Sequence, residues 1–340
     1  MALNLDKLIV SASHYHVAHR LAPLAAKEHG CFQEEVLPEV EIITTNHNED
    51  NLINALAAGT VHIGLDAKPQ VVLEAVHKRG LNLCFIAGWR NMPHWVVFGA
   101  KGMKSIEDVK GKRMSCRDIL GIDAVQMRLI FRRLGWDPDK DVQWVRGLHP
   151  VKHAARALRA GQVDCAYVWN IEAPALLEEG YPLLMRLDHT YYKDGYPERS
   201  VVSTVELVEQ HPRVVIGFLK GLTRGYRMIR DQPRNKEYVD DLERRTRAVD
   251  ADPEERAMKL EHTAEEWARY PLPLDGAMPI KGLEIVVSQE QEIGNLPANF
   301  RAEQVLRLEC LQQAQRELAE RQDLRAELER VQAWVDKVGY

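Results

Sequence analysis

Polar and aromatic side chains gather just after the first predicted strand. Ser13, His14, Tyr15 and His16 follow the apolar run Leu8–Ser11 and precede a predicted helix. In an open α/β sheet, ligands bind beyond the carboxyl ends of the strands, so these hydroxyl and imidazole groups are expected to contact a ligand. The structural alternative is that Ser13 caps the helix and leaves the histidines exposed. Two histidines without a third ligand do not predict a metal site.

Three more predicted strands of the first half end in groups suited to a ligand. Asn46 offers an amide, Asp66 and Lys68 place a charge pair at the start of a helix, and Arg90 can hold a carboxylate or sulfonate bidentately. The alternatives are a surface turn at Asn46, an N-cap at Asp66 and a solvated side chain at Arg90. We predict ligand contact at these four positions, with Trp89 stacking on an aromatic ring.

The second half contributes two further strand ends. Cys116 and Arg117 precede a helix, where backbone N–H groups would hold an anion and Arg117 would add positive charge. Cys116 as a nucleophile would need a lowered pKa and a base that the sequence does not identify, so a buried thiol is favoured. Trp169 and Asn170 end another strand and are predicted to contact the ligand, with a core position as the alternative for Trp169.

The elements that must position these residues follow an alternating pattern. Short apolar runs alternate with helical periodicity, which predicts a mostly parallel sheet covered by helices, and 340 residues favour two lobes rather than one core. Beyond Gln232 the chain reads as helical without a further strand. In the last 40 residues, apolar positions three or four apart predict an amphipathic helix. This helix is expected to pack on the body of the protein or, alternatively, to form a homodimer as a coiled coil.

Composition excludes several classes of function. The net charge is −5 and no Lys/Arg stripe stands out, so nucleic acid is not an expected partner. Five cysteines without a CxxC pair favour reduced thiols over disulfides or zinc, and no apolar run is long enough to insert into a membrane. The first ten residues lack a signal-peptide pattern, so a cytoplasmic location is expected, and a periplasmic one only if an upstream signal was removed. GxSxG, P-loop and GxGxxG motifs are missing, which leaves any cofactor unknown.

Four stretches of sequence carry a family resemblance. They are HGCF at 29–32, LAAGTVHIG at 56–64, IEDVKGKR at 106–113 and LRAGQVDCA at 158–166. The second and fourth share a Leu-x-Ala-Gly-x-Val pattern, once in each half, which indicates two similar lobes or the chance reuse of a helix-Gly-strand junction. Together the stretches resemble the sulfonate, taurine and nitrate-type binding proteins and the related thiamine-pyrimidine synthases, over roughly residues 7–230.

The resemblance implies an α/β, two-lobed type II periplasmic-binding-protein-like fold with a helical C-terminal extension. Lobe 1 would comprise residues 1–100 and 196–300 and lobe 2 residues 101–195, with the amphipathic helix at 301–340. A ligand would be held in the cleft between two lobes that close around it. The expected function is binding of a small, anionic aromatic or heteroaromatic molecule, as in ABC-transporter substrate-binding proteins.

The alternative function is a cytoplasmic enzyme on the same fold that acts on an aromatic or heteroaromatic acid, as a decarboxylase, desulfinase or pyrimidine-synthase-like protein. His14 or His16 would then be the general acid/base, and Arg90 or Arg117 would hold the anion. The chain departs from both catalytic relatives. It has Asp66 and Gln70 where the synthases carry Lys and His, and 13–15 reads Ser-His-Tyr where the desulfinases place a nucleophilic Cys. Neither reaction is therefore transferred to this chain.

Overall fold

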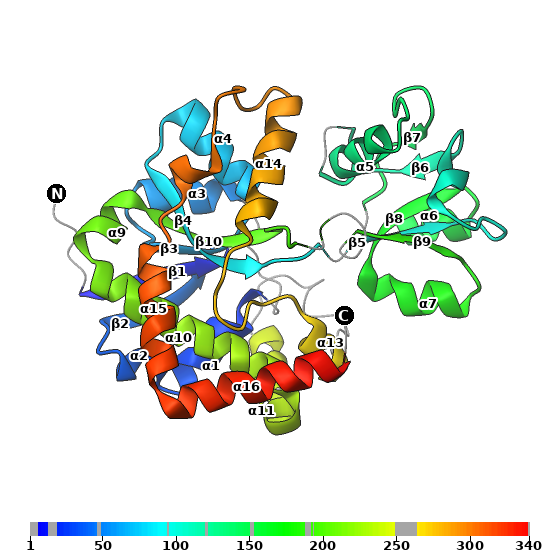
Figure 1. Ribbon diagram of the computed structural model, residues 1–340. Coiled ribbons are helices and arrows are strands. Elements are labelled where there is room, and N and C mark those ends of the chain that lie inside the picture. Colours follow the sequence, from blue (N-terminus) through cyan, green and yellow to red (C-terminus); the bar gives the residue numbers. More distant parts are fainter. Residues whose placement is uncertain are drawn as a thin grey trace. The chain divides into compact units, whose positions relative to one another are not determined.

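The computed structural model describes residues 6–12, 19–45, 49–93, 95–119, 122–149, 153–187, 192, 194–248 and 264–338. The chain divides into two compact units, unit 1 (residues 1–91 and 196–340) and unit 2 (residues 92–195). Each unit has its own five-stranded sheet (Figure 1). The predicted first boundary at residue 100 differs from this division, because strand β5 (Trp95–Gly99) pairs with β8 (Cys165–Trp169) in the sheet of unit 2.

The sheet of unit 1 has the strand order β2-β1-β3-β10-β4. Its strands are β1 (Lys7–Ala12), β2 (Glu39–Thr44), β3 (Ile63–Ala67), β4 (Leu83–Arg90) and β10 (Arg199–Thr204). Strand β1 runs parallel to β2 and β3, whereas β10 runs antiparallel to β3 and β4. Because β10 is antiparallel, its first residue lies where its neighbours end, and Arg199 pairs with Arg90.

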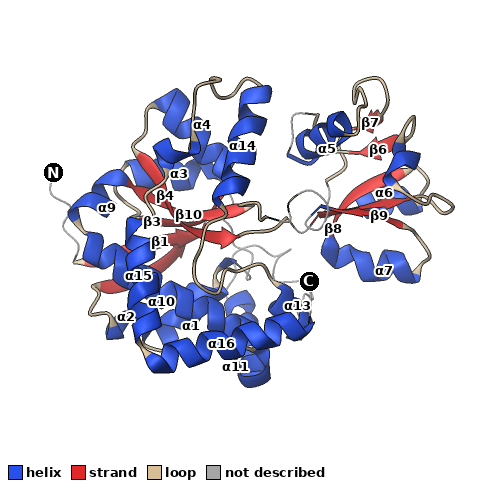
Figure 2. Ribbon diagram, in the orientation of Figure 1, coloured by secondary structure: helices blue, strands red, loops and turns tan. Residues whose placement is uncertain are grey.

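Helices flank the sheet of unit 1 (Figure 2). They are α1 (Leu21–Glu28), α2 (Cys31–Glu34), α3 (Glu49–Ala57), α4 (Pro69–Arg79), α9 (Val205–Gln210), α10 (Pro212–Arg230), α11 (Gln232–Ala248), α13 (Ala264–Arg269), α14 (Ile280–Glu292), the 3-10 helix η4 (Ala302–Val305), α15 (Glu309–Glu320) and α16 (Gln322–Val338). Local sequence sets the ends of α4. Pro69 occupies its first turn, where no N–H is needed, and Gly80 ends it in the left-handed conformation with φ 63°. No helix among the described residues is long and apolar enough to span a membrane.

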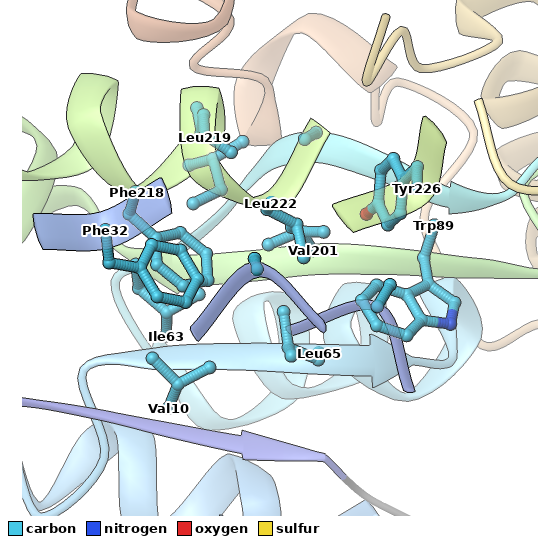
Figure 3. Packing of buried hydrophobic residues seen from close by; sticks show 14 of the residues in the cluster. Val10, Phe32, Ile63, Leu65, Trp89, Val201, Phe218, Leu219, Leu222 and Tyr226 are labelled. Carbon is cyan, nitrogen blue, oxygen red and sulfur yellow. The ribbon is translucent and has the colours of Figure 1, made fainter. Parts of the chain in front are cut away.

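Helix α10 forms the centre of the unit 1 core. Phe218 from α10 stacks on Phe32 with ring centroids 5.4 Å apart, and Tyr226 meets the edge of Trp89 (Figure 3). Gly225 permits the close approach of α10 to α1, because a Cβ atom there would lie 2.1 Å from the carbonyl oxygen of Ala22. Backbone contact at this point therefore requires glycine.

Unit 2 has the strand order β7-β6-β8-β5-β9. Its further elements are the 3-10 helix η2 (Ile106–Val109), β6 (Arg113–Ser115), α5 (Ile122–Arg133), β7 (Gln143–Val145), α6 (Ala154–Arg159), the 3-10 helix η3 (Asn170–Glu172), α7 (Ala173–Glu178) and β9 (Leu183–Arg186). Strand β9 was not predicted. Its four residues read Leu-Leu-Met-Arg, a run too short for its periodicity to separate strand from helix.

The C-terminal segment forms two helices rather than the single one predicted for 301–340. Helices α15 and α16 are separated at Arg321, whose backbone is extended (φ −82°, ψ 112°). The apolar stripe is buried within unit 1: Leu311 and Ala314 join the core of α10, while Val331 and Val335 pack with Leu274. The stripe therefore packs on the body of the protein, as one of the two predicted arrangements requires.

Candidate functional site

Seven of the predicted site residues fall within the described part of the chain. Asp66, Lys68 and Arg90 lie in unit 1, and Cys116, Arg117, Trp169 and Asn170 lie in unit 2. The other five, Ser13, His14, Tyr15, His16 and Asn46, lie outside the described residues. Each unit therefore presents its own group of strand-end residues.

Asp66 is the next-to-last residue of β3 and has no exposed surface. Its backbone is left-handed, with φ 59°, which is uncommon for a residue other than glycine. The proposed capping role does not hold, because Lys68 occupies the N-cap of α4 and no side chain caps that helix. Backbone strain of this kind persists only where the surrounding structure fixes the residue firmly.

Three basic side chains surround the carboxylate of Asp66. His19 contacts Oδ2 through Nδ1, while Arg199 Nε and Arg90 Nη2 lie 3.6 and 3.7 Å from Oδ1. Burial opposes ionisation, but His19, Arg199 and Arg90 outweigh it and hold the pKa of Asp66 well below its ordinary value. Asp66 is therefore ionised at neutral pH, at the carboxyl end of β3.

Arg90 is engaged with protein groups rather than projecting toward solvent. It is 4 % exposed, its Nη2 lies 3.7 Å from Glu198 Oε1, and its Nη1 donates to the Tyr270 hydroxyl at 3.4 Å. Burial alone would lower the pKa of Arg90, but Glu198, Tyr270 and Asp66 together raise it. The stacking predicted for Trp89 is wrong, because its ring is fully buried in the core.

Glu49, the first residue of α3, contacts Arg199 of this group and adds one more cation, Lys68. Its Oε1 lies 3.0 Å from Arg199 Nη1 and 3.5 Å from Lys68 Nζ, and its Oε2 accepts the Lys68 N–H at 3.3 Å. The Lys68 side chain is 32 % exposed, against 11 % for Arg199 and 10 % for Glu49. Lys68 is thus the more accessible cation of this pair.

These residues form one group at the carboxyl edge of the unit 1 sheet, which we call the unit 1 ion cluster. Its members are His19, Glu49, Asp66, Lys68, Arg90, Glu198 and Arg199. Three carboxylates lie beside three Lys or Arg side chains, and His19 contacts the carboxylate of Asp66. The sequence predicted only Asp66, Lys68 and Arg90. No local pattern identified the other four, since β10 and the start of α3 reach this edge only through the fold.

In unit 2, the strand end after β6 differs from the predicted anion site. The Arg117 side chain is exposed, but its backbone N–H donates to Oδ2 of Asp123 at 2.7 Å. Asp123 lies in the first turn of α5 and is 3 % exposed. The protein's own carboxylate therefore accepts one of the backbone N–H groups at the strand end where a bound anion was expected.

Cys116 is a buried thiol, the state that the sequence favoured. It is 1 % exposed, and burial, reinforced by the nearby Asp123, raises its pKa to about 11. All five cysteines are free and buried. A thiol with a raised pKa is a poor nucleophile at neutral pH.

Aromatic side chains occupy the end of β8. Half-buried Trp169 pairs across the sheet with Trp95, the first residue of β5. The Trp95 ring stacks on Tyr167, with centroids 5.2 Å apart, and the Tyr167 hydroxyl donates to Gln126 Oε1 at 2.6 Å. Asn170 is exposed in η3. Trp95 and Asp123, which the sequence did not single out, thus belong to this edge of unit 2.

Metal binding finds no support in the part of the chain that the structure describes. No group of three His, Cys, Asp or Glu side chains there is arranged to hold a metal ion.

Comparisons with known proteins identify a matching family and similar solved structures. The sequence model of the family described as "NMT1/THI5 like" matches residues 20–236. The periplasmic aliphatic sulphonate binding protein SsuA from Escherichia coli is 16% identical, with a TM-score of 0.65 over 89% of this chain and 97% of that chain. The periplasmic nitrate-binding protein NrtA from Synechocystis PCC 6803 is 14% identical, with a TM-score of 0.64 over 99% of both chains.

A third structure on this fold is a cysteine-to-serine mutant of DSZB in complex with biphenyl-2-sulfinic acid. It is 14% identical, with a TM-score of 0.61 over 92% of this chain and 99% of that chain. A search of the curated proteins finds no match. The chain has the α/β, two-lobed type II periplasmic-binding-protein fold with C-terminal helices. Because the family model covers more than half of its length, the chain belongs to the NMT1/THI5-like family.

Proposed function

We propose that this protein binds a small organic anion, as a substrate-binding protein of the ABC-transport type does. Its fold is shared with a sulphonate-binding and a nitrate-binding protein, which supports this class of ligand. The observation that carries the proposal is the unit 1 ion cluster, which fixes partly exposed Lys68 at the edge of the sheet where α/β proteins bind ligands.

The surroundings of Lys68 suit an anion. Its ammonium group lies 3.5 Å from Glu49 Oε1, and the Lys68 side chain is partly exposed, so an anion can approach it from solvent. Its backbone N–H already binds Glu49, so the start of α4 is held in place before a ligand arrives. A preorganised cation loses little freedom on binding, which favours affinity.

The ligand in this proposal also carries an aromatic or heteroaromatic ring. Unit 2, taken by itself, has half-buried Trp95 and Trp169 paired across its sheet. Tryptophan faces favour stacking on planar rings.

Calorimetric titration of the full chain with nitrate, propanesulfonate, benzenesulfonate and benzoate tests the proposal. At least one anion should bind, and Lys68→Met should weaken its binding about tenfold or more through loss of a charge-assisted hydrogen bond. Lys78→Met, at the far end of α4 where Lys78 pairs with exposed Glu74, is the matched control and should bind normally. Absence of binding by all four anions would contradict the proposal.

A second candidate function is favoured by the pairing of His19 with Asp66. An imidazole held through Nδ1 by a buried, ionised carboxylate is the arrangement that orients a general base. We propose this dyad as the proton-transfer group if the protein is an enzyme acting on an aromatic acid. Product formation from benzoates and arenesulfinates, followed by chromatography, tests it. Turnover that survives His19→Gln would exclude the dyad. Binding without any turnover would exclude the enzymatic function and retain only the binding function.

A further inference from the structure

Hydrogen bonds through one buried hydroxyl link the start of helix α4 to helix α14. The side-chain N–H of Gln70, the second residue of α4, donates to the Tyr196 hydroxyl at 3.1 Å. That hydroxyl donates in turn to Oε1 of Gln289 on α14, at 2.9 Å. Tyr196 has no exposed surface, and Gln289 is 4 % exposed. The link is therefore part of the interior of unit 1, where α4 and α14 lie side by side (Figure 1).

The backbone of Tyr196 is fixed by the sheet of unit 1. Its N–H donates at 2.7 Å to the carbonyl of Asn91, the residue that follows β4. Asn91 is held in its turn, because its N–H binds the Pro271 carbonyl at 3.1 Å and its Nδ2 donates to the Ala277 carbonyl at 2.6 Å. A buried side chain on an anchored backbone has little freedom to move. The Tyr196 hydroxyl is thus a fixed point to which α4 is attached.

The first turn of α4 carries the lysine assigned to anion binding. Lys68 is the N-cap residue of the helix, and no side chain caps it. Glu49 accepts the Lys68 N–H at 3.3 Å, and Gln70, two residues later, is held by Tyr196. Because the residues of one helical turn are fixed together, anchoring Gln70 also fixes the backbone that carries Lys68.

We propose that Tyr196 and Gln289 are positioning residues for anion binding, which act through Gln70 on the first turn of α4 and so hold Lys68 in place. The inference rests on the proposed function, binding of a small anion at Lys68. It extends the binding machinery to α14, which lies beyond residues 20–236 that the family model matches. A cation that is held in place loses less freedom when the anion arrives, which raises the affinity.

Hydrogen exchange tests the positioning without any ligand. The N–H groups of Val71 and Val72 both bind the Lys68 carbonyl, at 3.1 and 3.2 Å, so their exchange reports opening of the first turn of α4. Tyr196→Phe keeps the ring but removes the hydroxyl, and it should speed the exchange of these two amides about fivefold. Exchange at the rate of the original protein would overturn the inference.

Calorimetry tests the effect on binding, with nitrate, propanesulfonate, benzenesulfonate and benzoate as probes. For each anion that the original protein binds, Tyr196→Phe should weaken the affinity about fivefold. Gln289→Met removes the acceptor at the other end of the same hydrogen bond and should weaken the affinity as much.

Tyr226→Phe is the matched control. Tyr226 has no exposed surface either, and its hydroxyl donates to the Gly88 carbonyl at 3.0 Å instead of contacting Gln70 or Gln289. Each tyrosine variant loses a buried hydroxyl that donates one hydrogen bond, so thermal unfolding should show similar losses of stability. Only Tyr196→Phe should lose anion affinity, and equal affinities of the two variants would overturn the inference.

A double variant separates positioning from a general loss of stability. Once Lys68→Met has removed the ammonium group, adding Tyr196→Phe should weaken anion binding no further. Additive losses would mean that Tyr196 acts elsewhere and would overturn the inference while leaving anion binding intact. If the original protein binds none of the four anions, the proposed function fails, and the role of Tyr196 in binding fails with it.

Discussion

Arg199 and Glu49 connect the first residue of β10 to the first residue of α3, with Nη1 3.0 Å from Oε1. Both side chains are largely buried, at 11 and 10 % exposure. Since β10 is the strand by which the chain returns to unit 1, this pair fastens the returning strand to the edge that also holds Asp66 and Lys68. One carboxylate thereby links α3, α4 and β10.

Replacing Glu49 by Gln should separate stability from binding. Loss of this carboxylate leaves buried Arg199 with weaker compensation, so the free energy of unfolding should fall by about 3 kcal/mol. Lys68 is released from its ion pair at the same time, so anion affinity should rise. Denaturant unfolding and calorimetry measure the two effects. The control Glu74→Gln, which removes a carboxylate exposed on α4, should change neither the free energy of unfolding nor the anion affinity. A loss of anion affinity in Glu49→Gln would contradict the role given to Lys68.

His62 should make unit 1 sensitive to mild acid. Its Nδ1 accepts the Ile9 N–H at 2.9 Å, and burial, with a contribution from His211, lowers the pKa of His62 below its ordinary value of 6.5. A histidine whose pKa is lower in the folded protein than in the unfolded chain makes its full contribution to stability at pH values above its pKa in the unfolded chain. This contribution is lost as the pH falls through that value toward the pKa in the folded protein. Unfolding free energies should therefore decrease between about pH 7.5 and 5.5.

A variant assigns this pH dependence to His62. His62→Asn retains an acceptor but does not titrate, so it should flatten the profile measured by denaturant unfolding. Exposed His77→Asn is the control and should preserve the slope of the original protein. An identical slope in His62→Asn would mean that other groups cause the acid sensitivity.

Arg230 should be a strong determinant of stability through its hydrogen bonds to backbone carbonyls. At 5 % exposure it donates to the carbonyl of Leu272 at 2.7 Å and twice to that of Ala268, at 2.6 and 3.1 Å. Arg230→Met would remove these donors and should lower the free energy of unfolding by about 3 kcal/mol. Exposed Arg234→Met should be nearly neutral in the same denaturation assay. Comparable stabilities of the two variants would disprove this assignment.

The contact of α10 with α1 can be tested by adding single methyl groups. In Gly225→Ala the new Cβ would lie 2.1 Å from the Ala22 carbonyl oxygen, whereas in Gly217→Ala it would lie 2.8 Å from a methyl group of Leu37. A backbone carbonyl cannot move without shifting its helix, but a leucine side chain can change rotamer. Gly225→Ala should therefore lose about 3 kcal/mol and Gly217→Ala clearly less, as measured by thermal unfolding. The reverse order would contradict this packing.

The sequence predicted the alternating strands and helices well because each carries its own local periodicity. It also identified the strand ends that hold Asp66, Lys68 and Arg90. It did not reveal that Arg199 lies beside Asp66 or that Glu198 lies beside Arg90. Glu198 and Arg199 lie at the start of β10, an antiparallel strand from far along the chain, and only the fold brings them to Asp66 and Arg90.

The same limit applies in unit 2. The pattern of a strand end followed by a helix predicted that backbone N–H groups there would hold an anion, and in the structure one of them, the Arg117 N–H, donates to Asp123. A carboxylate in the first turn of a helix is visible in the sequence, but which N–H group it binds is decided by the path of the loop.

The placement of Leu311 and Ala314 in the core of α10 bears on the order in which the protein is made. Unit 2 is one continuous segment, whereas unit 1 combines the start of the chain with its last helices. During synthesis, unit 2 has all of its residues available long before the core of unit 1 can close. We therefore expect the inserted unit to acquire its structure on the ribosome, while the strands made first remain incompletely packed until the final helices emerge.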